Sequence, residues 1–270
     1  KRQLNPRALS RVGASGLWQF MYYTGKRYDL NVTSYVDERR DPVKASKAAA
    51  LFLRELYNIY GDWHLAIAAY NCGPGNVNRA IARSGGQRDF WKIYYHLPRE
   101  TRGYVPAFIA ASYAMTYATE HNLHPTTSNL PIASDTIMVN RPLHFEQVSK
   151  MLNLPIELIR DLNPQYRHDV VPATAPKTHP LSLPVEVSFA FAQNEDSIYA
   201  FNRQKYFPDN KIVPISEATY GHYTPANSAK LIYTVKEGDV PGGIAGKFNV
   251  RLSDLKYWNG IRRNIIRLSL

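Results

Sequence analysis

Apolar residues return at helical spacing in the first half of the chain, most clearly between Val43 and Tyr60. The apolar positions of this stretch are Ala48, Leu51, Phe52, Leu56 and Ile59. Such spacing is typical of one face of a helix. The pair Asp41-Pro42 is a strong helix start and Gly61 a typical helix end, so the sequence predicts a helix from Val43 to Tyr60.

The next segments are also expected to be helical. Asp62 precedes the stretch from Trp63 to Asn71, which is apolar on nearly every side and is therefore predicted to be buried. Asn76 is expected to cap a helix that runs to Ser84, and a shorter segment follows from Asp89 to His96. Residues 1–125 are thus predicted to be largely helical.

A proline interrupts the last helical pattern of this region. Pro106 would be tolerated near a helix start but would kink a helix interior, so we expect a helix from Ala107 to about Glu120. Residues 124–134, rich in Pro, Thr, Ser and Asn, are predicted to form a linker.

Two later segments resemble each other in pattern, which indicates an internal repeat. Each predicts a strand, two helices and a strand. In the first repeat these are 135–139, 145–152, 156–162 and 181–184, and in the second 231–235, 242–248, 252–258 and 264–268. Residues 185–227 are mixed and tyrosine-rich and stay unassigned, as an extension of the first repeat or a linker. The predicted class is α+β and multidomain, a mainly helical domain followed by small βααβ modules.

Charge narrows the kind of partner. The 270 residues carry a net charge of +11, distributed as 17 basic against 9 acidic residues in 1–125, 8 against 10 in 126–227 and 8 against 3 in 228–270. This balance favours a polyanion such as nucleic acid, an anionic lipid or an acidic cell-wall polymer. The basic residues match no common nucleic-acid motif. No run of 18 apolar residues appears, and the first residues lack the apolar core of a signal peptide.

The chain has one cysteine, Cys72. A single cysteine excludes an intrachain disulfide framework and a cysteine-cluster zinc site. A thiolate nucleophile remains an alternative, but no histidine lies near it in sequence, and a small buried side chain is the favoured interpretation.

Two glycine-rich stretches carry the residue types of a sugar-binding cleft. Gln19 and Asn71 each offer an amide donor and acceptor to hydroxyl or acetamido groups, while Trp18 and Tyr70 offer flat apolar faces with a polar edge. Glycine allows the backbone to approach a ligand closely. The alternative is that both aromatic residues are ordinary core residues.

Four segments in order resemble the lytic transglycosylase family, whose catalytic domain has a lysozyme-like fold. They are 13–21 (GASGLWQFM), 37–42 (DERRDP), 68–75 (AAYNCGPG) and 100–105 (ETRGYV). The second repeat, with 233–239 (YTVKEGD) and 258–260 (WNG), resembles a LysM module, and the first resembles a degenerate one. The expected domains are 1–123 (transglycosylase), 124–134 (linker), 135–184 (degenerate LysM-like), 185–227 (unassigned extension or linker) and 228–270 (LysM).

The resemblance implies cleavage of the bond between N-acetylmuramic acid and N-acetylglucosamine in peptidoglycan, without water, leaving a 1,6-anhydro end. One glutamic acid suffices, because the 6-hydroxyl of the sugar attacks. No metal or organic cofactor is implied. The family places this acid five positions before the proline matched by Pro6, where this sequence has Lys1. Either the acid has been lost or residues around the start are omitted here, and we favour omission because the other motifs are intact.

The remaining roles follow from the matched positions. The resemblance implies that Gln19 and Asn71 hold sugar groups and that Tyr70 and Tyr104 line the cleft near the scissile bond. Glu100 is a fallback acid, although an ion pair with Arg102 or Arg40 is the favoured interpretation. Asp37, Glu38 and Asp41 are expected to serve as capping and ion-pair residues around Arg39 and Arg40.

In the LysM-like repeat, the resemblance implies glycan contacts from two loops. The residues concerned are Gly238, Asp239, Val240, Asn259 and Gly260. The position of Val240 usually carries a hydroxyl in this family, so Val240 followed by Pro241 weakens the expected hydrogen bonding.

Two other functions stay open. The chain could be a catalytically inactive peptidoglycan-binding or scaffold protein, as Lys1 suggests, or a hydrolase of the goose-type lysozyme kind. The expected partner in each case is the peptidoglycan glycan strand rather than nucleic acid, which also accounts for the basic charge. The resemblance alone implies a periplasmic location, with outer-membrane association through an anchor outside this sequence.

Overall fold

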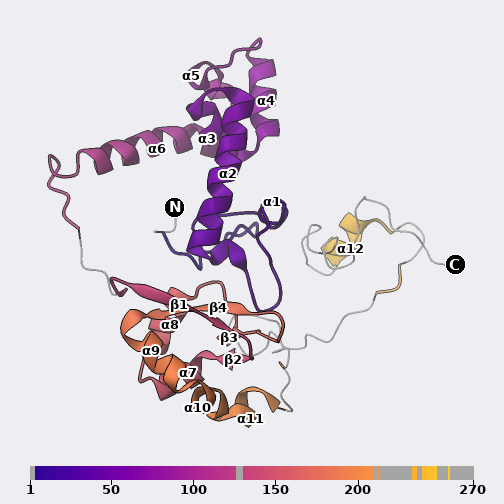
Figure 1. The fold of residues 1–270 in the computed structure, drawn as a ribbon. Helices are drawn as coiled ribbons and strands as arrows, with labels where there is room; N and C mark the ends of the chain where they lie inside the picture. Colours follow the sequence, from indigo (N-terminus) through magenta and orange to yellow (C-terminus); the bar gives the residue numbers. More distant parts are fainter. Residues whose placement is uncertain are drawn as a thin grey trace. The chain divides into compact units, whose positions relative to one another are not determined.

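A computed structural model describes residues 4–125, 130–208, 212, 233–235, 239–247 and 255 of the chain. The chain divides into two compact units, residues 1–214 and 215–270. Each unit is considered by itself. The first contains a helical region followed by a small mixed module, as the sequence predicted (Figure 1).

The described part of the helical region contains six α-helices, with α2 the longest, and two short 3-10 helices. They are α1 (Tyr22–Arg27), η1 (Glu38–Arg40), α2 (Pro42–Tyr60), α3 (Trp63–Cys72), α4 (Pro74–Arg83), α5 (Phe90–Ile93), η2 (Tyr94–His96) and α6 (Arg99–Thr116). Figure 1 shows α3, α4 and α5 gathered at one end of α2, whereas α6 leads away from them.

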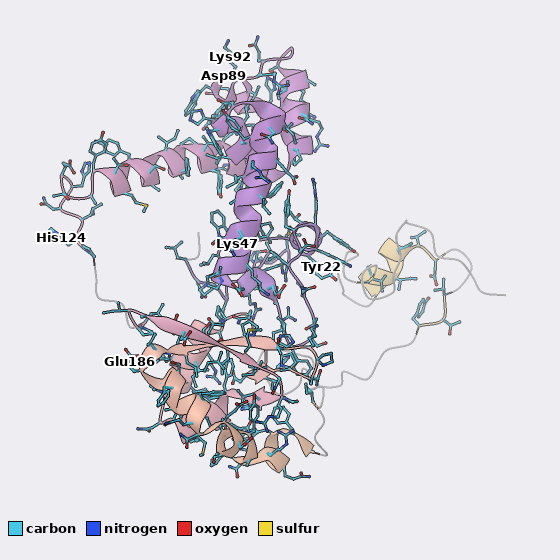
Figure 2. The ribbon with its side chains drawn as sticks, viewed as in Figure 1. Tyr22, Lys47, Asp89, Lys92, His124 and Glu186 are labelled. Atoms are coloured by element: carbon cyan, nitrogen blue, oxygen red, sulfur yellow. The ribbon has the colours of Figure 1, made fainter. Side chains whose placement is uncertain are left out.

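Local signals set the ends of the central helices as predicted. The Asp41 carboxylate accepts hydrogen bonds from the backbone N–H groups of Val43 and Lys44, both at 2.9 Å, at the start of α2. Gly61 ends α2 in the left-handed conformation, which costs glycine little. Asp62 caps α3 in the same way, and Asp89 caps α5 through the N–H of Lys92, close to it in Figure 2.

The core of this region is built around α3. Its buried residues include Leu65, Ala66, Ala68 and Ala69, which no solvent reaches. The three small alanine side chains among them allow α2, α4 and α6 to pack closely on α3. The predicted burial of α3 is therefore confirmed. On α2, Ala48 and Leu56 are buried, but Ile59 is 54% exposed although it shares their apolar pattern.

Two helix starts differ from the prediction. Helix α4 begins at Pro74, and Asn76 lies inside it, donating from Nδ2 to the carbonyl of Cys72 at 2.6 Å instead of capping the helix. Helix α6 begins at Arg99, eight residues earlier than expected, with Pro106 inside it. The first part of α6 packs its buried Thr101 and Val105 against the core, and this packing offsets the hydrogen bond that proline cannot donate.

The mixed module has the predicted βααβ order with additional elements. These are β1 (Ser134–Val139), β2 (Leu143–His144), α7 (Phe145–Met151), α8 (Ile156–Leu162), β3 (Val170–Val171) and β4 (His179–Pro184). Strands β1 and β4 pair antiparallel, with Ser134 opposite Pro184 and Val139 opposite His179. The short pair β2 and β3 was not predicted.

The segment after β4 continues the module. It forms α9 (Val185–Gln193), α10 (Glu195–Ala200) and α11 (Arg203–Tyr206). Helix α9 packs on β1 and β4, and α10 packs on α7. Phe191 and Ile198 enter the same core as Phe145 and Leu181. The sequence left residues 185–227 unassigned between an extension of the first repeat and a linker, and the described part to Tyr206 forms these helices.

The second unit is described in part. Helix α12 (Pro241–Lys247) occupies the position of the predicted helix 242–248. Of the predicted strand 231–235, the described residues 233–235 have no regular secondary structure. The predicted elements 252–258 and 264–268 lie outside the described residues, apart from Leu255.

One segment of the helical region belongs to the core of the mixed module. Val36, just before η1, forms an antiparallel bridge with Tyr166 and is buried in the hydrophobic cluster of the module. The flanking backbone hydrogen bonds run from Asp37 N–H to Gln165 O (2.8 Å) and from Arg167 N–H to Tyr35 O (2.7 Å). The two parts of the first unit therefore share a core and a stretch of backbone pairing.

Candidate active site

The loop from Gly13 to Phe20 is held closed by its own backbone. Ser15 and Phe20 exchange N–H to O hydrogen bonds of 3.1 Å in both directions, and Gly16 N–H donates to Ala8 O at 2.9 Å. Gly16 has φ +84°, and a Cβ there would lie 1.8 Å from the carbonyl oxygen of Arg39. Only glycine fits this close approach of two backbone segments.

Gln19 is half-buried in this loop and adopts a left-handed backbone conformation, φ +53°. Its amide nitrogen donates to Gly16 O at 2.7 Å and to Ala8 O at 3.3 Å. Its amide oxygen accepts no hydrogen bond from the described residues. The side chain expected to hold sugar groups thus also stabilises the loop, and its oxygen is the atom that remains for a ligand donor.

Trp18 and Tyr70 are brought together from opposite ends of the predicted cleft. The Tyr70 hydroxyl donates to Trp18 O at 3.0 Å, and the two rings meet edge to face with centroids 6.3 Å apart. Trp18 Nε1 donates to Ser46 Oγ at 2.8 Å. Burial raises the pKa of Tyr70, with a smaller contribution from Tyr104, so the hydroxyl remains a proton donor at ordinary pH.

Asn71 lies at the end of α3 between two residues of α6. Thr101 Oγ1 donates to Asn71 Oδ1 at 2.8 Å, and Asn71 Nδ2 donates to Glu100 Oε1 at 3.4 Å. Thr101 is 1% exposed, whereas Glu100 is exposed. The amide of Asn71 is consequently oriented from both of its ends by the segment ETRGYV.

A buried carboxylate lies beneath the Gly13–Phe20 loop. Asp37 is completely buried and pairs with Arg39 through Nε–Oδ1 and Nη2–Oδ2 contacts of 2.8 Å each. Arg39 Nη1 donates to the carbonyls of Gly13 (2.9 Å) and Phe20 (3.1 Å), and Arg167 Nη2 donates to Asp37 at 3.0 Å. Burial by itself would raise the pKa of Asp37, but the two guanidinium groups lower it below its usual value.

The other acidic residues of the segment DERRDP have structural partners. Asp41 caps α2, as expected. Glu38 pairs with Lys44 and accepts from the backbone N–H of Asn31 rather than pairing with the arginines, which corrects that part of the prediction. Burial would raise the pKa of Glu38, and the Lys44 contact lowers it.

Arg40 and Arg102, the predicted ion-pair partners of Glu100, make other contacts in the described part of the chain. Arg40 Nε lies 3.8 Å from Asp37 Oδ2 and donates to Ser15 Oγ at 3.3 Å. The guanidinium of Arg102 lies over the ring of Tyr94, 6.0 Å from its centroid. Arg40 lies near Asp37 because a buried carboxylate is stabilised by nearby positive charge.

Of the remaining predicted residues, the structure describes Tyr104 and Cys72 but not Lys1. Tyr104 on α6 is partly buried against the same core as Tyr70, and Cys72 is half-buried, which raises the pKa of its thiol. Lys1, at the family's acid position, lies outside the described residues.

Ser46 and Thr101, which orient the side chains of Trp18 and Asn71, were not predicted. Thr101 lies within a matched motif and could have been considered. Ser46 on α2 carries no local signal.

The LysM-type residues are described in part. The Tyr233 hydroxyl donates to Asp239 Oδ2 at 2.8 Å, which places the predicted Asp239 next to the first segment of the repeat. Val240 is 60% exposed. Gly238, Asn259 and Gly260 lie outside the described residues.

Within the described residues, no group of three or more His, Cys, Asp or Glu side chains could hold a metal ion. The helices described in the structure include none that is both long and apolar enough to cross a membrane.

Three family models match the chain in order. Residues 3–93 match the transglycosylase SLT domain. Residues 133–200 match the LysM-like domain of lytic transglycosylase MltD, and residues 233–268 match the LysM domain. The second match extends through α9 and α10, consistent with their packing on the module.

Several of the similar curated proteins carry transglycosylase names. The chain is 28% identical over 262 residues to membrane-bound lytic murein transglycosylase D of Escherichia coli (strain K12). This match covers 96% of the chain and 54% of that protein. The chain is 34% identical over 112 residues to the soluble lytic murein transglycosylase of the same strain, covering 39% and 17%. It is 40% identical over 74 residues to a transglycosylase of Enterobacteria phage PRD1, covering 27% and 26%. The chain spans about half the length of the first of these relatives.

Proposed function

Because the chain carries a transglycosylase SLT domain followed by LysM-type modules, we propose that it is a peptidoglycan lytic transglycosylase. It would cleave the β-1,4 bond between N-acetylmuramic acid and N-acetylglucosamine and leave a 1,6-anhydro end. The LysM-type modules would bind the same glycan and hold the enzyme on the wall. A location in the cell envelope follows from this substrate and from the relatives' names.

The observation that carries the proposal is the joining of three matched motifs around Tyr70 and Asn71. Tyr70 donates to Trp18 O, and Asn71 contacts both Thr101 and Glu100. Aromatic edges, a fixed amide and an exposed carboxylate at one place are groups that recognise the hydroxyl and acetamido groups of a glycan. No cofactor takes part in the proposed reaction.

The proposed chemistry needs one carboxyl group. It protonates the glycosidic oxygen while the bond from that oxygen to C1 of the muramic acid breaks. The 6-hydroxyl oxygen of the same sugar then bonds to C1, and its proton returns to the carboxylate. A hydrolase would use water in place of the 6-hydroxyl.

Glu100 is proposed to orient Asn71 rather than to act as this acid. It accepts the hydrogen bond of Asn71 Nδ2, which is the role of a carboxylate, and it is exposed at the first turn of α6. The acid would then be a carboxyl group outside the described residues of the native protein.

Digestion of purified sacculi tests the function. The native protein is incubated with sacculi, and the released muropeptides are analysed by mass spectrometry. Anhydro-muropeptides are expected, each lighter by one water than the hydrolysis product. Hydrated products would instead indicate a goose-type lysozyme activity, and binding to sacculi without release would indicate an inactive glycan-binding protein, the alternative that Lys1 favours.

The variant Glu100→Gln separates the two roles of this carboxylate. An orienting role predicts a loss of about 2- to 10-fold in kcat/KM, the effect of one hydrogen bond. A matched control is Glu120→Gln, an exposed change beyond the end of the same helix. Complete loss of activity in Glu100→Gln alone would identify Glu100 as the acid.

A further inference from the structure

The mixed module, residues 133–208, contacts the candidate active site through a chain of charged groups. Arg167 of the module donates to the completely buried Asp37 of the helical region. Asp37 holds Arg39 by two further contacts, and Arg39 binds the carbonyls of Gly13 and Phe20 at the two ends of the loop that carries Gln19. Each link is a charge-assisted or buried hydrogen bond, the stronger kinds in proteins.

The backbone supports the same path. Asp37 N–H donates to Gln165 O at 2.8 Å, and the neighbouring Val36 is buried in the module's own core. The carboxylate of Asp37 is thus fixed from the module side by both its main chain and its side chain. A second ion pair, between Arg7 and Asp161, is half-exposed and contributes less.

We propose that the LysM-like module is a positioning element of the active site, with Arg167 acting through Asp37 and Arg39 to hold the Gly13–Phe20 loop in its binding conformation. The module then has a role besides glycan binding, because its presence sets the geometry of Gln19 and Trp18. The catalytic part of this inference rests on the proposed transglycosylase function.

Hydrogen exchange of the loop amides tests the positioning without any need for activity. In Arg167→Met, the amides of Ser15, Gln19 and Phe20 are expected to exchange about tenfold faster than in the wild-type chain, because one charge-assisted hydrogen bond is lost. Arg167→Lys keeps the charge but not the fork of donors and should show a smaller increase. It also serves if Arg167→Met does not fold.

A control within the same module is Arg160→Met. Arg160 has a similar side-chain exposure, 28% against 31% for Arg167. It pairs with Asp169 and Glu157 inside the module. The Arg160→Met variant should leave the exchange rates of the loop amides unchanged. Equal exchange of the loop in Arg167→Met and the wild type, or an equal increase in Arg160→Met, would overturn the proposal.

Kinetics on sacculi give the second readout. Arg167→Met is expected to lower kcat while the binding of the chain to sacculi is retained, because the module's own fold is intact. Loss of binding with unchanged kcat would contradict a positioning role. If the wild-type chain releases no anhydro product, the proposed function fails, and the exchange comparison still decides whether the module positions the loop.

Discussion

Replacing Gly16 by alanine is the most direct test of how the active-site loop is built. A Cβ at this position would lie 1.8 Å from Arg39 O and 2.7 Å from Arg39 C, and φ is +84°. Both atoms belong to the backbone, so no side chain can rotate away. The loop and the segment DERRDP must therefore separate.

The expected magnitude follows from three contributions. A left-handed conformation costs an alanine about 1 to 2 kcal/mol. Overpacking against backbone costs about 1 to 3 kcal/mol, and loss of the Gly16 N–H to Ala8 O bond (2.9 Å) costs about 1 kcal/mol. Gly16→Ala should destabilise the first unit by at least about 3 kcal/mol.

Gly13 offers a matched control in the same loop. It has nearly the same φ, +86°, but nothing lies within 4 Å of a Cβ there. Gly13→Ala should therefore cost only the conformational part, about 1 to 2 kcal/mol. The difference between the two variants isolates the effect of the close approach.

Urea unfolding followed by tryptophan fluorescence measures both variants, since Trp18 lies in the loop itself. With a slope of about 1 to 3 kcal/mol per molar urea, the two midpoints should differ by about 1 M. Equal midpoints for Gly13→Ala and Gly16→Ala would refute the reasoning, because the clash would then have no energetic effect.

Three further changes probe the groups around the loop. Asp37→Asn should destabilise the chain by about 3 to 5 kcal/mol at neutral pH by leaving Arg39 unbalanced. The pKa of Asp37 is lowered in the folded state, so its contribution to the free energy of unfolding is present above about pH 4 and is lost as the pH falls through the folded-state pKa. The stability of Asp37→Asn in urea should therefore change less with pH on the acid side than that of the wild type. Tyr70→Phe should cost about 1 kcal/mol through the lost bond to Trp18 O, with the ring contacts kept, as thermal unfolding would show. Thr101→Val should lower kcat/KM on sacculi about 2- to 10-fold by freeing Asn71 Oδ1, and an unchanged value would argue against a fixed Asn71 amide.

The elements that the sequence predicted well are those with local signals. The cap at Asp41, the stop at Gly61 and the burial of α3 each depend on a few neighbouring residues, and each is confirmed. The start of α6 differs from the prediction because Pro106, which favours a helix boundary, lies inside the helix. Packing of Val105 on the core overrides that local preference.

The sequence names candidate site residues, which stay predictions, but it does not predict most of their contacts. The structure brings Trp18 into contact with Tyr70, and other partners of Trp18 and Asn71 come from α2 and α6. Ser46 gives no sequence signal, and Arg167 lies 130 positions after Asp37. Such pairs depend on how distant segments meet, which periodicity and spacing do not encode.

The bridge between Val36 and Tyr166 also bears on how such chains can be recombined. The predicted linker 124–134 is the place in the sequence where gene fusion would be expected to exchange one module for another. A crossover there would uncover Val36 and remove Arg167 from Asp37. We therefore expect the helical region and the first module to stay together when genes recombine. A foreign module would keep the stability of the helical region only if it supplied its own pairing strand and its own arginine.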